Sequence, residues 1–168
     1  MPEASLFTPD EFKKNFKRNK NGKKEAKIQL ALCDKIKKDY PDIIFSCDLA
    51  SGMKLPIHIA GLHKRMRSSR GHCDFFAAEP VYNGDVVYSG FFLELKKDRN
   101  EVYNKNGTFK KKLIKVKKDG VVVEEYDHIQ EQWDMILKLR EKGYFADFGM
   151  GLEDCIEKWE KYLSMKVK

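Results

Sequence analysis

Long apolar runs and closely spaced cysteines are both missing from this chain of 168 residues. No apolar stretch approaches the roughly 18 residues needed to cross a bilayer, so we expect no membrane-spanning helix. The four cysteines, Cys33, Cys47, Cys73 and Cys155, contain no CxxC pair, which excludes a disulfide framework and a cysteine-rich zinc site. The opening MPEASLFTPD has no basic end followed by an apolar stretch, so we expect no secretory signal. Together these absences predict a cytoplasmic protein with free thiols.

Glycine and proline are also scarce, with 11 and 5 residues, whereas apolar residues make up 42% of the chain. This composition excludes a disordered or fibrous protein and provides for a sizeable core. The length fits a single domain spanning 1–168, without repeats or linkers. We expect a basic N-terminal helix or extension at 1–22 and a core at 23–168 that includes a basic arm at 105–126.

Basic residues are concentrated in three segments. Lys and Arg outnumber Asp and Glu by eight to two in residues 11–27, by four to none in 61–70, and by ten to two in 95–118. Because cations near a phosphate release condensed counterions, such segregation suits a surface that faces nucleic acid. A solvated helix face and hairpin would look the same, so charge alone leaves both interpretations open.

Hydrophobic periodicity predicts helices that alternate with strands. A first helix is expected to begin at Thr8-Pro9-Asp10-Glu11 and to end before Asn21-Gly22. Further helices are expected at Lys23–Asp39, Ile59–Ser69, Asp127–Lys142 and Leu152–Ser164. The expected strands are Ile43–Cys47, Cys73–Ala77, Val87–Lys97 and Tyr144–Phe148, with a hairpin turn at Tyr82-Asn83-Gly84-Asp85. Lys111–Lys118 and Val121–Glu125 flank Asp119-Gly120 and predict a protruding basic β-hairpin. The order indicates an α/β fold with a small mixed β-sheet flanked by helices.

The strand FFLELK, residues 91–96, carries a carboxylate and an amine on one face. Period-2 alternation places Glu94 and Lys96 together with Phe92. Asp74 begins the preceding apolar run, where an acid is out of place unless something binds it. On neighbouring strands, Asp74 and Glu94 could converge to hold a hard cation such as Mg²⁺. Lys96 could then orient or deprotonate an attacking water.

The order Asp, about 20 residues, then Glu-x-Lys resembles the PD-(D/E)XK nuclease superfamily. The chain is similar to the VRR-Nuc branch, in its compact stand-alone form, from about Lys24 to Leu163. The motifs that carry the resemblance are Lys24–Gln29, Ser51–Lys54, Gly71-His72-Cys73-Asp74, Phe92–Lys97, His128–Gln132 and Gly143-Tyr144. Cys73 stands where the family usually has proline, which affects the local backbone and not a ligand.

The resemblance implies a restriction-endonuclease-like core and a role for each matching residue. Asp74 and Glu94 would bind Mg²⁺ or Mn²⁺ together with the Leu95 carbonyl. Glu25 would reach the site from the first long helix, as a second-metal ligand or through water. Lys96 would be the catalytic lysine, and Gln132 would position it or the water. Gln130 is a rival for this last role, although Gln132 keeps the family's distance to Gly143.

The resemblance also implies a metal-dependent deoxyribonuclease, expected to be an endonuclease, that hydrolyses phosphodiester bonds. No membrane partner and no nucleotide cofactor are expected. Structure-specific substrates such as a Holliday junction or a flap would be processed in recombination, repair or phage DNA metabolism, in a bacterial or phage-infected host cytoplasm. Two symmetric cuts at a junction would require a homodimer. The basic residues expected to hold the DNA backbone are Lys64, Arg65, Arg67, Arg70, Lys110, Lys111 and Lys112.

Three other interpretations remain open at this point. The chain could be a catalytically inactive nucleic-acid-binding protein of the same fold. Its basic arm could instead grip an acidic partner protein. A zinc site built from His58, His63, His72 and Cys73 fits no standard spacing.

Overall fold

The central sheet has four strands in the computed structural model, which describes residues 20–48, 55–68, 70–83 and 86–166. Their order is β1-β2-β5-β8, with bounds Phe45–Cys47 (β1), Phe75–Ala77 (β2), Phe91–Lys96 (β5) and Phe145–Met150 (β8). Neighbours β1, β2 and β5 are antiparallel, whereas β8 runs parallel to β5. The sheet is therefore small and mixed, as the sequence predicts.

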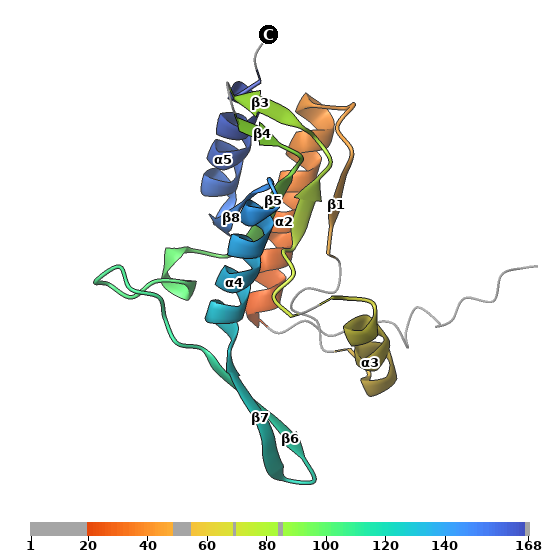
Figure 1. Ribbon diagram of the computed structural model, residues 1–168, viewed down its shortest axis with the longest axis vertical. Coiled ribbons are helices and arrows are strands. Elements are labelled where there is room, and N and C mark those ends of the chain that lie inside the picture. The colour runs from red at the N-terminus through yellow and green to blue at the C-terminus, as the bar shows by residue number, and fades with distance from the viewer. Residues whose placement is uncertain (1–19, 49–54, 69, 84–85, 167–168) are drawn as a thin grey trace, which may run out of the picture.

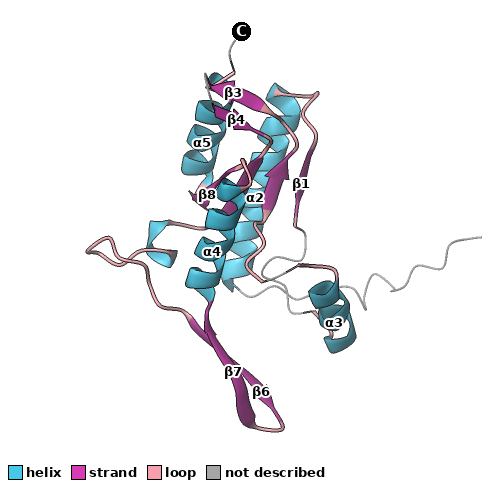
Figure 2. Ribbon diagram, viewed as in Figure 1, coloured by secondary structure: helices cyan, strands magenta, loops and turns pink. Residues whose placement is uncertain are grey.

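Helices cover both faces of this sheet (Figure 1). α2 (Lys20–Asp39) and α5 (Leu152–Ser164) contact each other on one face, and α4 (His128–Glu141) packs against β8 on the other. α3 (Ile57–Arg65) stands away from these layers (Figure 2). The expected α/β class, with helices flanking the sheet, is confirmed.

The two faces of β5 pack against different helices. One face carries the apolar side chains Phe91, Leu93 and Leu95, which lie in a cluster with α2 and α5 and are at most 1% exposed. Phe92 belongs to the second cluster, in which α4 packs on β8. Because successive strand side chains alternate, Glu94 and Lys96 share the α4 face with Phe92. Two polar side chains are thereby enclosed between the sheet and α4.

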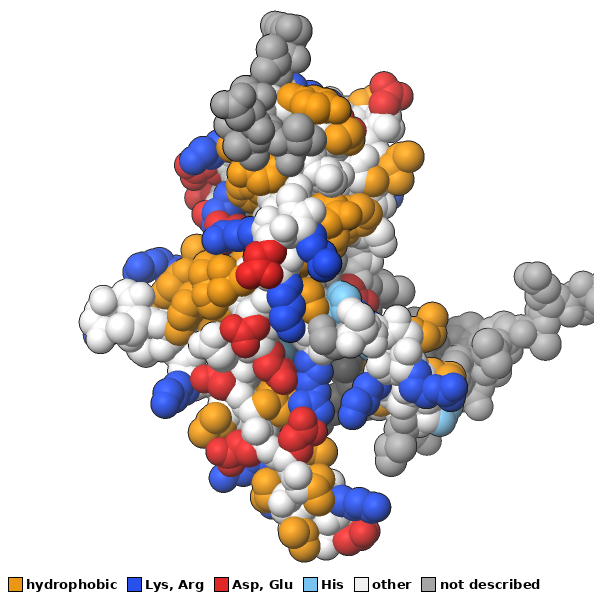
Figure 3. Space-filling view, viewed as in Figure 1, with side chains coloured by type: hydrophobic (Ala, Val, Ile, Leu, Met, Phe, Trp, Pro, Cys, Tyr) orange, Lys and Arg blue, Asp and Glu red, His pale blue; other side chains and the backbone are white. Residues whose placement is uncertain are grey.

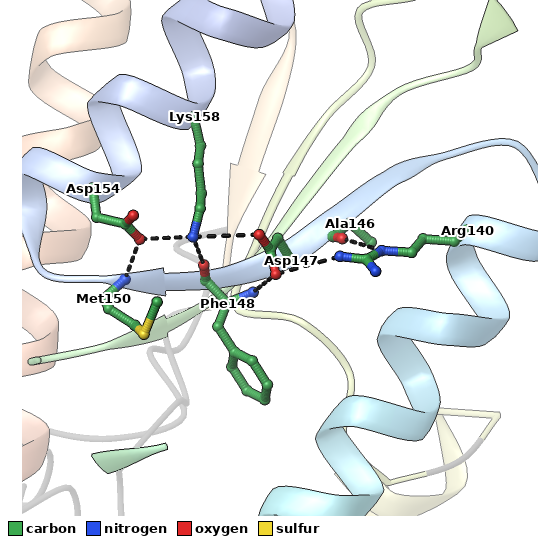
Figure 4. Close-up of polar contacts among 7 residues, drawn as sticks. All are labelled: Arg140, Ala146, Asp147, Phe148, Met150, Asp154 and Lys158. Carbon is green, nitrogen blue, oxygen red and sulfur yellow. Dashed lines mark hydrogen bonds and ion pairs between the residues drawn. The ribbon is translucent and has the colours of Figure 1, made fainter. Parts of the chain in front are cut away.

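The open edge of β8 is closed by polar side chains (Figure 4). Arg140 Nε of α4 donates to the Ala146 carbonyl at 2.8 Å. Lys158 Nζ of α5 donates to the Phe148 carbonyl at 2.6 Å and lies 2.8 Å from Asp154 Oδ2. Unpaired strand edges invite pairing with other chains, so these bonds protect β8 from strand addition.

Two hairpins extend from the sheet. β3 (Val81–Asn83) pairs with β4 (Val86–Tyr88), and β6 (Leu113–Lys118) pairs with β7 (Val121–Asp127). The β6–β7 hairpin projects beyond the layers (Figure 1), and we call it the arm. Its turn places Asp119 and Gly120 at φ 52° and 81°, the left-handed conformation that favours an Asp-Gly pair. The predicted protruding hairpin is confirmed.

Several predicted boundaries were wrong. α2 begins at Lys20, so Asn21-Gly22 lies in its first turn and does not break the helix. The backbone amides of a first turn have no hydrogen-bond acceptor within the helix in any case. α3 ends at Arg65 and not at Ser69. The helix expected to begin at Thr8 lies outside the described residues.

The strand predicted as Val87–Lys97 is divided into β4 and β5. The break falls at Gly90, where an added Cβ would lie 2.8 Å from the Ala77 carbonyl oxygen. The Ser89 amide donates to the Gly143 carbonyl at 2.9 Å instead of continuing a strand ladder. This close backbone approach separates the β3–β4 hairpin from the main sheet. A short 3₁₀ turn, η1 (Arg99–Glu101), follows β5. None of the helices in the described ranges is long and apolar enough to cross a membrane.

Candidate active site

Two carboxylates meet where β2 begins and β5 ends. Phe75 pairs with Leu93 in the antiparallel register, so Asp74 lies opposite Glu94 where that register continues. The Leu95 amide donates to Asp74 Oδ2 at 2.9 Å, which fixes this carboxylate against β5. Asp74 and Glu94 are only 6% and 2% exposed. The structure therefore brings together the two acids that the sequence places on neighbouring strands.

Lys96 and Gln132 both bind one oxygen of Glu94. Lys96 Nζ donates to Glu94 Oε1 at 2.7 Å, and Gln132 Nε2 of α4 donates to the same oxygen. Glu94 Oε2 and Gln132 Oε1 are buried and have no hydrogen-bond partner among the described residues. Since buried polar atoms are normally paired, these two oxygens are available to a ligand or water.

Gln130 does not join this group. It is exposed on α4 and donates from Nε2 to Asp134 Oδ1 at 2.8 Å. Gln132, two residues later, faces the sheet and is 4% exposed. Of the two glutamines that the sequence leaves open, only Gln132 contacts the carboxylates.

Burial and neighbouring charge act on the ionisation of the site. The pKa of Glu94 is raised to about 8, first by burial and then by the charge of Asp74, while Lys96 opposes the rise. Burial also acts to lower the pKa of Lys96, but the charges of Glu94 and Asp74 outweigh burial and raise it. Lys96 is therefore a buried ammonium that the surrounding carboxylates hold in its charged form.

Glu25 approaches the same group from α2. Burial raises its pKa to about 7; the charge of Lys96 opposes this rise, whereas those of Glu101 and Asp74 add to it. These interactions place Glu25 close enough to sense both Lys96 and Asp74. Asp74, Glu94 and Lys96 thus lie together at one end of the sheet, and Glu25 lies within electrostatic range of Lys96 and Asp74.

Glu101 and His128 are neighbours of the site to which the sequence assigned no role. Glu101, in η1, hydrogen-bonds with Glu25 and accepts from the Lys97 amide at 3.1 Å. His128 begins α4, and burial lowers its pKa to about 4, with further lowering by Lys96 and Lys112. No local sequence signal identifies Glu101 as a neighbour of the site. The only signal for His128 is its position one helical turn before Gln132.

The oxygen atoms present suit a hard divalent cation. Glu94 Oε2 is buried without a hydrogen-bond partner in the described part of the chain, and carboxylates together with a backbone carbonyl are ligands that Mg²⁺ and Mn²⁺ prefer. Across those same residues, no group of three His, Cys, Asp or Glu side chains could hold a metal ion. A cation here would therefore need the Leu95 carbonyl, water or substrate oxygens besides Asp74 and Glu94. The same finding gives the alternative zinc site no support.

The predicted DNA-binding residues fall into two groups. Lys64, Arg65, Lys111 and Lys112 are exposed, and Lys110 is partly exposed. Arg67 forms an ion pair with Asp48, and Arg70 binds both oxygens of Glu124 on the arm. Arg70 also lies over the Tyr126 ring, 4.3 Å from its centroid. The two arginines therefore connect parts of the protein to one another.

A groove of about 680 Å³ separates α3 from the arm and α4. Basic or histidine side chains in its lining are His63, Lys64, Arg67, Arg70, His128 and Lys138. Figure 3 shows Lys and Arg side chains on α3 and beside the arm on one face of the molecule. Through His128, whose pKa responds to Lys96, this groove adjoins the carboxylate site.

Comparison with known proteins identifies the fold. No protein-family model matches the chain, and no curated protein matches it in sequence. Among solved structures, the chain is similar to one titled VRR_NUC domain protein, with a TM-score of 0.53 and 20% identity over 85% of this chain and 90% of the other. The chain therefore shares the mixed α/β fold of a VRR_NUC domain protein.

Proposed function

We propose that this protein is a divalent-metal-dependent DNA nuclease that hydrolyses phosphodiester bonds. The observation that carries the proposal is the buried contact of Glu94 with Lys96 and Gln132, beside Asp74, in a fold shared with a VRR_NUC domain protein. Keeping several charged groups buried together is costly unless they serve a ligand or a reaction. A nuclease site accounts for both the composition and the burial of this cluster.

Asp74, Glu94 and the Leu95 carbonyl would hold Mg²⁺ or Mn²⁺, with Glu25 acting through water or at a second ion. Such an ion would polarise the scissile phosphate and make water a stronger nucleophile. The Leu95 amide holds Asp74 Oδ2, which leaves this carboxylate little freedom to turn. Binding a cation would also offset the repulsion between the carboxylates that raises the pKa of Glu94.

Lys96 and Gln132 would act on the attacking water and the phosphate. The Lys96 ammonium can donate a hydrogen bond to a phosphate oxygen and stabilise the negative charge that develops there. Gln132 Nε2 donates a hydrogen bond to Glu94 Oε1, while the buried Oε1 of Gln132 can accept a hydrogen bond from the water. The amide thereby positions a nucleophile beside the carboxylate that it also orients.

DNA would enter along the groove between α3, the arm and α4. The exposed Lys64, Arg65, Lys111 and Lys112 would contact backbone phosphates without reading base sequence. Such contacts make the affinity fall steeply as salt rises. We further propose structure-specific cleavage, with junctions and flaps preferred to plain duplex and a homodimer at symmetric junctions.

A cleavage assay tests the chemistry. Purified protein with Mg²⁺ or Mn²⁺ should cut DNA, whereas Asp74→Asn and Lys96→Met should reduce the rate at least about 100-fold and still bind. Gln132→Leu should also reduce the rate, while Gln130→Leu, a matched change on the exposed face of α4, should leave it unchanged. Equal inactivity of the wild type and all variants, with DNA binding intact, would instead identify an inactive nucleic-acid-binding protein.

A substrate panel tests the finer proposal. Four-way junction, flap, single-stranded and duplex substrates of equal length should be cut at different rates under the same conditions. Uniform rates on all four would contradict structure specificity while leaving the nuclease assignment intact. Sedimentation of the protein with and without a junction would establish whether a dimer forms.

A further inference from the structure

The groove beside the candidate active site contains a histidine with a defined position. His128 begins α4, where its amide donates to the Lys112 carbonyl at 2.9 Å. The preceding Asp127 accepts hydrogen bonds from the Ile129 and Gln130 amides and so caps the helix. These contacts fix the backbone that carries the imidazole, which lines the groove together with Arg70 and Lys64.

The imidazole of His128 has no hydrogen-bond partner of its own among the described residues. The charged groups that act on it are Lys96 and Lys112, opposed by Asp127. The charge of Lys96 is balanced by Glu94, whereas Lys112 is exposed, so Lys112 is the cation beside the ring that an anion could approach.

Burial keeps the His128 imidazole in its neutral form. The pKa of His128 is lowered to about 4, so the ring is neutral near pH 7. A neutral imidazole presents one N–H donor and one acceptor. It can therefore donate its N–H to a phosphate oxygen in the groove that it lines.

We propose that His128 forms a subsite for a DNA phosphate next to the one that is cleaved, with its imidazole N–H donating to a non-bridging oxygen. This subsite rests on the proposed function, because it would bind the next phosphate of the same DNA strand, where the strand leaves Lys96 and enters the groove. His128 thereby connects the basic groove to the carboxylate site. A polynucleotide strand, which carries consecutive phosphates, fits both places at once.

Binding to single-stranded oligonucleotides in EDTA tests the subsite without requiring cleavage. His128→Phe keeps a planar ring of similar size but removes the donor, and should weaken binding about 5- to 20-fold. His128→Asn keeps an N–H donor and should recover part of the loss. His58→Phe is the matched control, an exposed histidine of α3 outside the groove lining, and should bind like the wild type. Thermal melting without DNA would establish that all three variants are folded.

A scan with neutral methylphosphonates locates the phosphate. At one position, the modification should weaken wild-type binding by the same factor as His128→Phe, and should weaken the variant no further. Additive losses at every position, or wild-type affinity in His128→Phe, would overturn the subsite. A wild type that binds DNA but never cuts it would overturn the nuclease proposal and leave this test intact.

Discussion

Replacing Glu94 by glutamine should stabilise the metal-free protein at high pH. Glu94 contacts the buried ammonium of Lys96 beside Asp74, and burial, with repulsion from Asp74 and Glu25, disfavours the charged form of Glu94. Glutamine has nearly the same shape, and its carbonyl oxygen can still accept the hydrogen bonds from Lys96 and Gln132. Glu94→Gln should therefore remove the repulsion and keep most of the packing.

The magnitude and its pH dependence follow from the pKa of Glu94. A rise from 4.5 to about 8 corresponds to an upper limit of roughly 5 kcal/mol. The lost attraction to Lys96 and local relaxation reduce this, so we expect about 1–3 kcal/mol in favour of the variant. Because the folded protein binds this proton more tightly than the unfolded chain, wild-type stability is complete below about pH 4.5 and declines as the pH rises through about 8.

Thermal and urea unfolding in EDTA at pH 5 and pH 9 would measure this difference. At pH 9 the melting temperature of Glu94→Gln should exceed that of the wild type by about 3–10 °C, and at pH 5 the two should nearly coincide. Glu125→Gln, the same charge change on the exposed arm, serves as the control. A variant no more stable than the wild type at pH 9, or equally more stable at both pH values, would refute the reasoning. Mn²⁺ should stabilise the wild type and not Glu94→Gln.

Three further substitutions test contacts outside the carboxylate cluster. Arg70→Ala removes the ion pair to the arm and should increase amide hydrogen exchange in residues 113–127, which mass spectrometry would detect; unchanged exchange would count against this anchor. Lys158→Met removes the donor that closes the β8 edge and should cost about 1–3 kcal/mol in urea unfolding, with more aggregation by light scattering. Gly71→Ala places a Cβ 2.6 Å from the Glu131 carbonyl oxygen at φ +74°, so unfolding should show a loss of about 2 kcal/mol or more, and wild-type stability would contradict it.

The elements that sequence predicts well are those with a strong local signal. α5 has the predicted bounds Leu152–Ser164 because its apolar residues repeat at helical spacing and Gly151 precedes it at φ +91°. The arm follows from Asp119-Gly120 between two strand-forming runs. The alternation in residues 91–96 likewise placed Glu94 and Lys96 on one face. Each of these depends on neighbours within a few positions.

Features that depend on distant contacts were not predictable in the same way. The break at Gly90 arises from close approach to the Ala77 carbonyl and from a bond to Gly143, neither of which is visible locally. The choice between Gln130 and Gln132 depends on which face of α4 meets the sheet; the family's spacing to Gly143 favoured Gln132 but left Gln130 as a rival. Glu101 reaches Glu25 only because η1 folds back after β5.

Charge counts along the sequence overstate what the arm can offer to a phosphate. On the arm, Lys115 of β6 pairs with Glu125 of β7 and lies 3.1 Å from it, whereas Lys117 and Lys118 pair with valines. Arg70 binds Glu124 and lies 3.7 Å from Glu131, so much of its charge is already balanced within the protein. A phosphate would have to compete with these carboxylates for Arg70. At Lys64 of α3 and at Lys111 and Lys112 before β6, which are exposed, it would by contrast displace only water and counterions. Binding should therefore depend more on those lysines than on Arg70, whose main effect is to hold the arm against the groove.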